Sequence, residues 1–216
     1  MSRIVVFGAG GRAGRRVVAE AAGRGHEVTA VVRDHAAHED LAGENVTVVS
    51  GNALDAERIA EVSAGHDAAV QAAYQQDLPV EEFFPDSARA LLRGLGESGV
   101  RRLVLVGIGT NLEAEPGLLV QDTPGFPPEA RAFSLGHLAE LEVLRAADTE
   151  IDWLVLAPPP VALDTEAEAT GKYRIGDERA LPVVEGAPVF SYADLAVALI
   201  DEIESPKHHR GIVAIG

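Results

Sequence analysis

A glycine loop near the N-terminus is the part of the sequence best suited to bind a phosphate. Residues 8–14 read GAGGRAG and directly follow the apolar run of residues 4–7. Glycines let the backbone turn tightly and approach a phosphate closely, and a helix that begins there contributes its first N–H groups. We therefore expect the loop to hold the pyrophosphate of a dinucleotide. Its spacing fits either G-x-G-x-x-G/A or G-x-x-G-x-x-G, through Gly8, Gly10 and Ala13 or through Gly8, Gly11 and Gly14.

Arg33 directly follows the second apolar run, residues 26–32, at the place where a dinucleotide-binding fold contacts the adenosine ribose. A carboxylate there binds the 2′-OH of NAD, whereas a guanidinium suits the 2′-phosphate of NADP. Arg12, inside the glycine loop, is placed to close on the same phosphate. We therefore expect NADP as the cofactor, and NAD stays the alternative because Asp34 directly follows Arg33.

Small and polar residues after the third and fourth apolar runs extend the expected cofactor site. Asn52, with the backbone of Ala53 and Leu54, follows the third run, where the adenine of a dinucleotide is received. Ala72 and Ala73 end the fourth run, and their small side chains would let the cofactor lie across the strand.

The tyrosine and lysine of ordinary short-chain dehydrogenases, four residues apart, cannot be assembled from this sequence. The three tyrosines, Tyr74, Tyr173 and Tyr192, are followed at that distance by Leu78, Asp177 and Ala196. A conventional alcohol dehydrogenase or sugar epimerase is therefore disfavoured.

Other side chains are candidates for acid–base chemistry or for the substrate pocket. His137 lies on the helix that would carry the tyrosine and lysine, and it is either a proton donor or an inert helix histidine. Glu140 and Glu142 are expected on the solvated face of that helix. A flat apolar pocket has five candidate phenylalanines: Phe83, Phe84, Phe126, Phe133 and Phe190.

Composition narrows the possible partners. The chain has 216 residues and a formal net charge of −16, which argues against nucleic acid or an anionic membrane as partner. It has no cysteine, and its histidines and carboxylates show no metal-binding spacing. No apolar run is long enough to span a membrane and no leader precedes the first strand, so we expect a cytoplasmic protein. The choice between monomer and homodimer stays open.

Short apolar runs alternate with amphipathic stretches along the chain. The pattern predicts a single α/β domain over residues 1–216, a Rossmann fold whose doubly wound, mostly parallel sheet has the strand order 3-2-1-4-5-6. Strands are expected at residues 4–7, 26–32, 46–49, 67–73, 103–106, 153–156 and 212–215. Helices are expected at residues 15–24, 55–62, 86–98, 129–147 and 192–203, with a weakly helical segment at 35–41.

Three features mark the connections between these elements. Asp55 and Ser191 are placed to cap the helices that follow them. Residues 74–85, with two prolines, are expected to form a loop. The long connections 107–128 and 158–188 fall at the cofactor edge of the sheet and are expected to form the substrate side.

Longer stretches resemble the atypical short-chain dehydrogenase/reductases, in the NAD(P)H-binding group that includes nitrogen-regulator-like proteins. Within it the chain most resembles the NADH-flavin reductase branch, over essentially its full length. The more specific matches are QDTPGFP at 121–127 and FSYADLAVALIDEIESPKHHRG at 190–211. Other matches are LVLVGIGTNLEAEPG at 103–117, IDWLVLAPP at 151–159 and TGKYRIGDERALPV at 170–183. The resemblance favours the G-x-x-G-x-x-G reading of the loop.

The resemblance implies hydride transfer from NADPH to a flavin or similar flat acceptor, without a tyrosine–lysine pair. It places the nicotinamide near Gly107 and Pro158. The segment after the fifth strand departs from the family, because Asn111 stands where a serine is usual, so Thr110 and Asn111 join His137 as catalytic candidates. The alternative is a non-catalytic NAD(P)-binding sensor that reports redox state to a partner protein.

Overall fold

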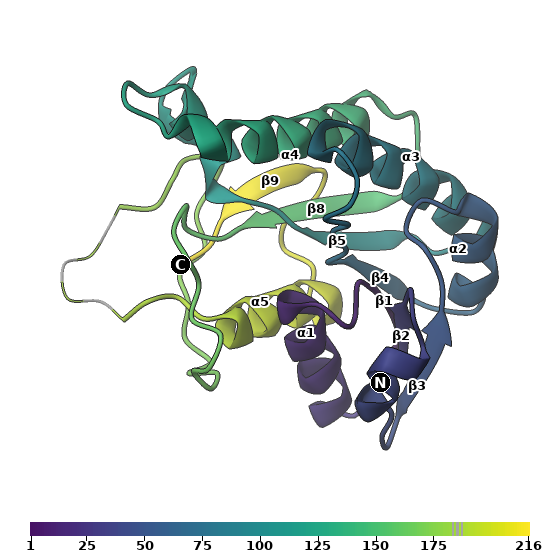
Figure 1. Ribbon diagram of the computed structural model, residues 1–216. Helices are drawn as coiled ribbons and strands as arrows, with labels where there is room; N and C mark the ends of the chain where they lie inside the picture. The colour runs from purple at the N-terminus through teal and green to yellow at the C-terminus, as the bar shows by residue number, and fades with distance from the viewer. Residues whose placement is uncertain (183, 185, 187) are drawn as a thin grey trace.

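The computed structural model describes residues 1–182, 184, 186 and 188–216 and forms one α/β domain (Figure 1). Seven parallel strands make one sheet in the order β3-β2-β1-β4-β5-β8-β9. The strands are β1 Arg3–Phe7, β2 Glu27–Val32, β3 Val46–Ser50, β4 Ala68–Gln71, β5 Arg102–Val106, β8 Asp152–Ala157 and β9 Gly211–Ala214. The doubly wound prediction is confirmed, and the C-terminal strand adds a seventh position beside β8.

Helices cover both faces of the sheet (Figure 1). On one face lie α1 (Arg12–Gly23) and α5 (Tyr192–Glu204), which pack against each other. On the other face lie α2 (Ala56–Ser63), α3 (Val80–Ser98) and α4 (Pro128–Ala146). Because both faces are covered, the strands are apolar throughout: Ile4 and Val6 of β1 join the core under α1 and α5, and Val5 and Phe7 join the other core.

Shorter elements lie in the connections. The 3₁₀ helix η1 (Ala36–Leu41) follows β2. The connection 107–128 holds η2 (Gly109–Asn111), a small antiparallel hairpin of β6 (Glu113–Glu115) and β7 (Leu118–Leu119), and η3 (Val120–Asp122). The connection 158–188 includes residues 183, 185 and 187, which lie outside the described residues.

The two expected helix caps are present. Asp55 Oδ1 accepts a hydrogen bond from the backbone N–H of Arg58 at 3.0 Å, and Ser191 Oγ accepts one from Asp194 at 2.9 Å. Both residues have extended backbone before the helix begins, as an N-cap requires.

The loop predicted over residues 74–85 is wrong in its second half. The helix α3 begins at Val80, and Pro85 lies inside it. A proline inside a helix costs about 3 kcal/mol because it removes a hydrogen bond and clashes with the preceding turn. Phe83 and Phe84 are only 2% and 3% exposed, and burying each gains about 1.5–3 kcal/mol, which offsets that cost.

Candidate functional site

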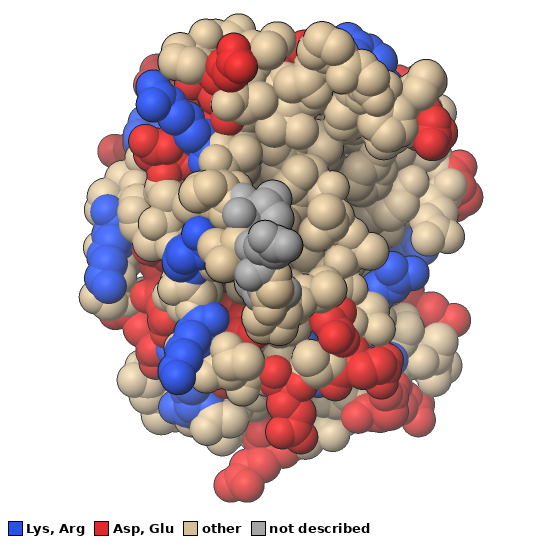
Figure 2. Space-filling model, turned by 90° about the vertical axis from the view of Figure 1, so that its left-hand side faces the viewer, with Lys and Arg blue, Asp and Glu red and all other residues tan. Residues whose placement is uncertain are grey.

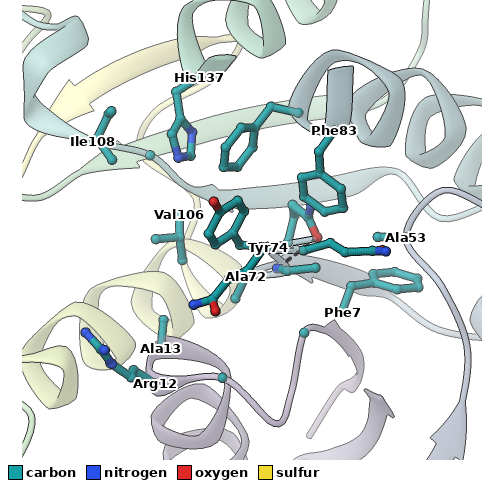
Figure 3. A pocket seen from close by; sticks show the side chains of 18 of the residues that line it. Phe7, Arg12, Ala13, Ala53, Ala72, Tyr74, Phe83, Val106, Ile108 and His137 are labelled. Carbon is teal, nitrogen blue, oxygen red and sulfur yellow. Dashed lines mark hydrogen bonds between the residues drawn. The ribbon is translucent and has the colours of Figure 1, made fainter. Parts of the chain in front are cut away.

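A cavity of about 1380 Å³ lies along the carboxyl ends of the central strands (Figure 3). It runs from the glycine loop after β1, past the end of β4, to the loops after β5 and β8. Its lining includes these predicted site residues: Gly8, Gly10, Gly11, Arg12, Ala13, Arg33, Asn52, Ala53, Ala72, Ala73, Gly107, Thr110, His137 and Pro158. Gly14, Leu54 and Asn111 are not part of the lining.

The surface around this cavity is mostly uncharged. Figure 2 looks onto the side of the molecule that is on the left in Figure 1, and it shows a hollow with largely uncharged walls. On this face acidic side chains gather below the hollow. The large negative net charge of the chain therefore does not prevent an anionic cofactor from entering it.

Close packing explains two of the glycines in the loop. Gly8 has a φ of +75°, and a Cβ there would stand 2.4 Å from the Cα of Ala73 at the end of β4. A Cβ on Gly14 would stand 2.1 Å from the carbonyl oxygen of Gly8. Gly14 therefore does not line the cavity. The third glycine of the G-x-x-G-x-x-G spacing is needed for close packing of α1 against the loop.

The N-terminus of α1 is built to receive an anion. Its N-cap is Gly11, which makes no side-chain capping bond, and its first turn holds no acidic residue. The first N–H groups of a helix have no partner within the helix, and here no side chain caps them. Since Gly11, Arg12 and Ala13 line the cavity, this end of the helix fits the pyrophosphate of a dinucleotide.

Two residues of opposite charge follow β2, and they make different contacts. Asp34 Oδ1 accepts a hydrogen bond from the N–H of Ala37 at 3.3 Å, so this carboxylate stabilises the start of η1. Arg33 is exposed at the rim of the cavity, and its Nη1 lies 3.4 Å from Asp77 Oδ1. An exposed ion pair contributes little to stability, so the guanidinium can leave Asp77 for a ligand with only a small loss of free energy.

Sequence reasoning missed a contact between η1 and the glycine loop. A Cβ on Gly10 would stand 2.5 Å from His38 Nε2, so the imidazole lies directly against the loop. His38 Nδ1 is 3.2 Å from Arg15 Nη2, and because arginine can only donate, Nδ1 accepts and Nε2 carries the hydrogen. Arg15 also donates to the carbonyl of Gly10 at 3.2 Å. The weak periodicity of residues 35–41 gave no signal for this arrangement.

The residues expected near the adenine have two roles, because some line the cavity and one shapes the turn after β3. Asn52 and Ala53 line the cavity. The backbone N–H of Leu54 donates to Asn52 Oδ1 at 3.1 Å, and this hydrogen bond shapes the turn after β3. The side-chain oxygen of Asn52 is thereby partly committed to the turn.

An aromatic wall, formed by Tyr74, Phe83, Phe84 and Phe133, closes the cavity on the side of α3 and α4. Tyr74 follows β4 and stacks on Phe84 with ring centroids 5.6 Å apart and planes at 4°. Phe133 meets the Tyr74 ring edge-on at 5.3 Å. Phe126 and Phe190, also candidates from the sequence, are not part of the lining.

His137 and Glu140 form a buried pair in the lining of the cavity. They are 7% and 2% exposed, and His137 Nδ1 lies 3.2 Å from Glu140 Oε2. The prediction that Glu140 lies on the solvated face of α4 is therefore wrong, whereas Glu142 is exposed as expected. Packing of α3 along α4 buries the inner face of α4. The buried carboxylate of Glu140 lies on this face and is stabilised by its pair with the imidazole of His137.

Thr110 and Asn111 have different surroundings. In the amide orientation that matches donors with acceptors, Asn111 donates to the carbonyl of Ser134 at 3.1 Å and accepts from the N–H of Leu138 at 3.0 Å. Asn111 thus attaches η2 to α4, and it is not part of the cavity lining. Thr110 lines the cavity, and its buried hydroxyl has no hydrogen-bond partner in the described part of the chain.

Two kinds of feature are absent from the described residues. No group of three or more His, Cys, Asp or Glu side chains there is placed to hold a metal ion. No described helix is both long enough and apolar enough to cross a membrane.

The fold, the glycine loop and the uncapped helix facing a cavity define a nucleotide-binding protein of the Rossmann class. Residues 8–206 match the model of the NAD(P)H-binding family, and the chain belongs to that family. The Rossmann fold and the family match agree with the resemblance to atypical short-chain dehydrogenase/reductases.

Individual relatives are similar over nearly their whole length. The chain is 34% identical over 211 residues to the uncharacterized protein YwnB of Bacillus subtilis, covering 95% of this chain and 94% of that one. A putative epimerase from Bacteroides thetaiotaomicron is 30% identical, with a TM-score of 0.87, over 100% of this chain and 96% of its own. A putative NADH-flavin reductase from Streptococcus pneumoniae is 26% identical, with a TM-score of 0.85, over 100% and 99%. The chain is accordingly a nucleotide-binding protein of the oxidoreductase type.

Proposed function

We propose that the protein is a reductase that transfers a hydride from NADPH to a flat conjugated acceptor such as a flavin. The observation that carries this proposal is the continuity of the cavity, in which the glycine loop and the aromatic wall line the same space. A dinucleotide whose pyrophosphate lies at the N-terminus of α1 would extend its nicotinamide towards Gly107 and Pro158. A planar acceptor would then lie between the nicotinamide and the aromatic wall.

The chemistry of such a transfer suits a site without a tyrosine–lysine pair. A flavin accepts hydride directly from a nicotinamide, so alignment of the two rings provides much of the catalysis. Tyr74, which stacks on the buried Phe84, and the edge-on ring of Phe133 offer apolar surface to a further planar ring. The two connections 107–128 and 158–188 form the substrate side of this proposal, since Ile108 and Val161 contribute to the lining.

Preference for NADPH over NADH is supported by the arginines at the rim. Arg12, Arg33 and Asp34 all line the cavity, but one oxygen of Asp34, the carboxylate that would bind the 2′-OH of NAD, accepts a hydrogen bond at the start of η1. Guanidinium groups form strong, charge-assisted hydrogen bonds with phosphates. Similarity to the Streptococcus pneumoniae protein described as a putative NADH-flavin reductase supports the flavin as acceptor.

The proposal is tested by following nicotinamide absorbance with riboflavin, FMN and menadione as acceptors. We expect turnover with NADPH, and we expect Phe133→Ala to raise the acceptor KM about tenfold through the loss of one aromatic contact. NADPH affinity should not change. Phe126→Ala is the matched control, because it removes the same side chain outside the cavity.

Tight NADPH binding without reduction of any acceptor would overturn the proposal. In that case the alternative, a sensor that binds NAD(P) and signals to a protein partner, would take its place.

A further inference from the structure

We infer that His137, oriented by Glu140, donates the proton that completes reduction of the acceptor. The inference rests on the proposed reductase function and assigns to this pair the task that tyrosine and lysine perform in ordinary short-chain dehydrogenases. His137 would be a catalytic residue, since it touches the acceptor, and Glu140 a positioning residue, since it acts through the imidazole.

The orientation of the imidazole carries the inference. His137 Nδ1 is taken by Glu140 Oε2, so Nε2 is the nitrogen left for a ligand. Nε2 has no hydrogen-bond partner among the described residues, although His137 is only 7% exposed. Figure 3 shows the ring reaching from α4 into the cavity on the same side as Tyr74. An acceptor lying against the aromatic wall would therefore meet Nε2.

Packing keeps that orientation fixed. The imidazole lies on the ring of Phe84 with centroids 3.8 Å apart and meets Phe133 at 5.0 Å. These two phenylalanines belong to the aromatic wall, so the proton donor is joined to the surface on which the acceptor would stack. A general acid needs this kind of fixed approach to the atom that it protonates.

Glu140 supplies the charge balance. It is 2% exposed, and His137 is its hydrogen-bond partner within the described part of the chain. A carboxylate can only accept, so Nδ1–H donates to Glu140, and the proposed role requires the imidazolium, in which Nε2 carries a second proton and the two charges of the buried pair balance. When the acceptor takes that proton, Glu140 still holds Nδ1 in place.

The reaction balances with these groups. Hydride from the nicotinamide adds to the electrophilic atom of the acceptor and leaves a negative charge on a conjugated nitrogen or carbonyl oxygen. The Nε2–H bond of His137 then breaks and an N–H or O–H bond forms on the acceptor. The imidazole regains a proton from water through the open cavity, so one NADPH and one proton are consumed for each reduced acceptor.

Tyr74 is the competing proton donor. Its ring is 39% exposed, and its hydroxyl has no partner among the described residues, so no base or cation there would stabilise the phenolate. The remaining ionisable side chains of the lining come from α1, α5 or the segments after β2 and β4, and none is on α4: Arg12, Arg33, Asp34, His38, Asp77 and Tyr192. Glu140 is therefore the charged group that faces His137.

Substitution of His137 tests the inference. We expect His137→Gln to lower kcat/KM for menadione about a hundredfold, as is typical when a general acid is removed. Its NADPH affinity should stay unchanged, and the alkaline decline of the wild-type rate should disappear. Tyr74→Phe and Glu142→Gln, the latter an exposed carboxylate on the same helix, should keep the wild-type pH profile. Glu140→Gln, which preserves shape, should lower kcat/KM about tenfold and gives a second test where His137→Gln does not fold.

Ligand binding provides a readout without turnover. With NADP⁺ bound, the wild type should bind the anion of 2-hydroxy-1,4-naphthoquinone about tenfold more tightly than neutral 1,4-naphthoquinone, because the anion resembles the charged, hydride-bearing acceptor. His137→Gln should lose that preference. Full activity with a retained preference in His137→Gln would overturn the inference and leave the proposed function standing. An inactive wild type would overturn both.

Discussion

At the scale of single residues, the local hydrogen bonds decide which candidate side chains are free to meet a ligand. Asn111 looked available in the sequence, but its amide is bonded to the backbone of α4, and Asp34 lines the cavity with one of its two oxygens bonded to η1. Arg33 and His137 face the cavity with donor groups that no described residue occupies fully. These two side chains and the backbone of the glycine loop therefore keep donor groups for a ligand.

Arg33→Ala should separate the two nicotinamide cofactors. Loss of one charge-assisted bond to the 2′-phosphate is worth about 1.5 kcal/mol, so the Kd for NADPH should rise about tenfold and that for NADH should not change. Fluorescence titration of both cofactors measures this. Arg93→Ala, an exposed arginine paired with Glu97 on α3, is the control. Equal affinities for NADPH and NADH, unaffected by Arg33→Ala, would contradict a 2′-phosphate site.

At the scale of elements, the approach of α1 to the end of β1 shapes the cofactor loop. Gly14 packs against the backbone of Gly8, and Ala73, which follows β4, also packs against Gly8. The N-terminus of α1 can then face the cavity with its N–H groups uncapped. A side chain at these contacts would separate the elements that bind the pyrophosphate.

Gly14→Ala should impair the cofactor loop, whereas Gly23→Ala on the same helix should not. A methyl group on Gly14 would stand 2.1 Å from Gly8 O, but one on Gly23 would meet nothing within 4 Å. We expect Gly14→Ala to lower the free energy of unfolding by about 1–3 kcal/mol and to weaken NADPH binding at least tenfold. Thermal unfolding and fluorescence titration measure the two effects. Normal binding by Gly14→Ala would show that α1 does not position the pyrophosphate.

At the scale of the whole molecule, a buried ion-pair network lies at the edge of the sheet opposite the cavity. Arg102 at the start of β5 is 8% exposed and pairs with Glu202 of α5 at 3.1 Å and with Asp152 of β8 at 2.7 Å. Burial opposes ionisation of Glu202, but hydrogen bonds from the His208 side chain and from the N–H groups of Lys207 and His208 lower its pKa. The network joins β5, β8 and α5 to the segment before β9.

Glu202→Gln should destabilise the fold in a pH-dependent way. Breaking a buried pair costs about 3 kcal/mol, so the free energy of unfolding at neutral pH should fall by about that amount. Because folding lowers the pKa of Glu202, its contribution is complete above the unfolded pKa of about 4.3 and is lost as the pH falls through the lower folded value. Urea unfolding at neutral and acidic pH measures the difference.

The control for this experiment is Glu97→Gln on α3, where the pair with Arg93 is exposed. It should change stability by less than about 0.5 kcal/mol at either pH. A loss in Glu202→Gln that is the same at both pH values would contradict an ionised, stabilising Glu202. NADPH binding should be normal in both variants, since the network and the cavity lie at opposite ends of the strands.

The sequence by itself determined the strands, their order, the glycine loop and the caps Asp55 and Ser191. These features depend on residue spacing within one element or one turn, and right-handed crossovers fix the order of the strands. The start of α3 was missed because Pro85 opposes a helix locally, and only the burial of Phe83 and Phe84 explains why the helix forms.

Only the tertiary structure decided which side chains meet in the cavity. His38 lies on Gly10, Tyr74 stacks on Phe84 beside Phe133, and Glu140 pairs with Nδ1 of His137 in the lining of the cavity. The first contact brings η1 back onto the glycine loop, and the others depend on the packing of α3 against α4. Local periodicity carries no information about such packing, because the free energy of burial depends on the partner surface and not on the segment alone.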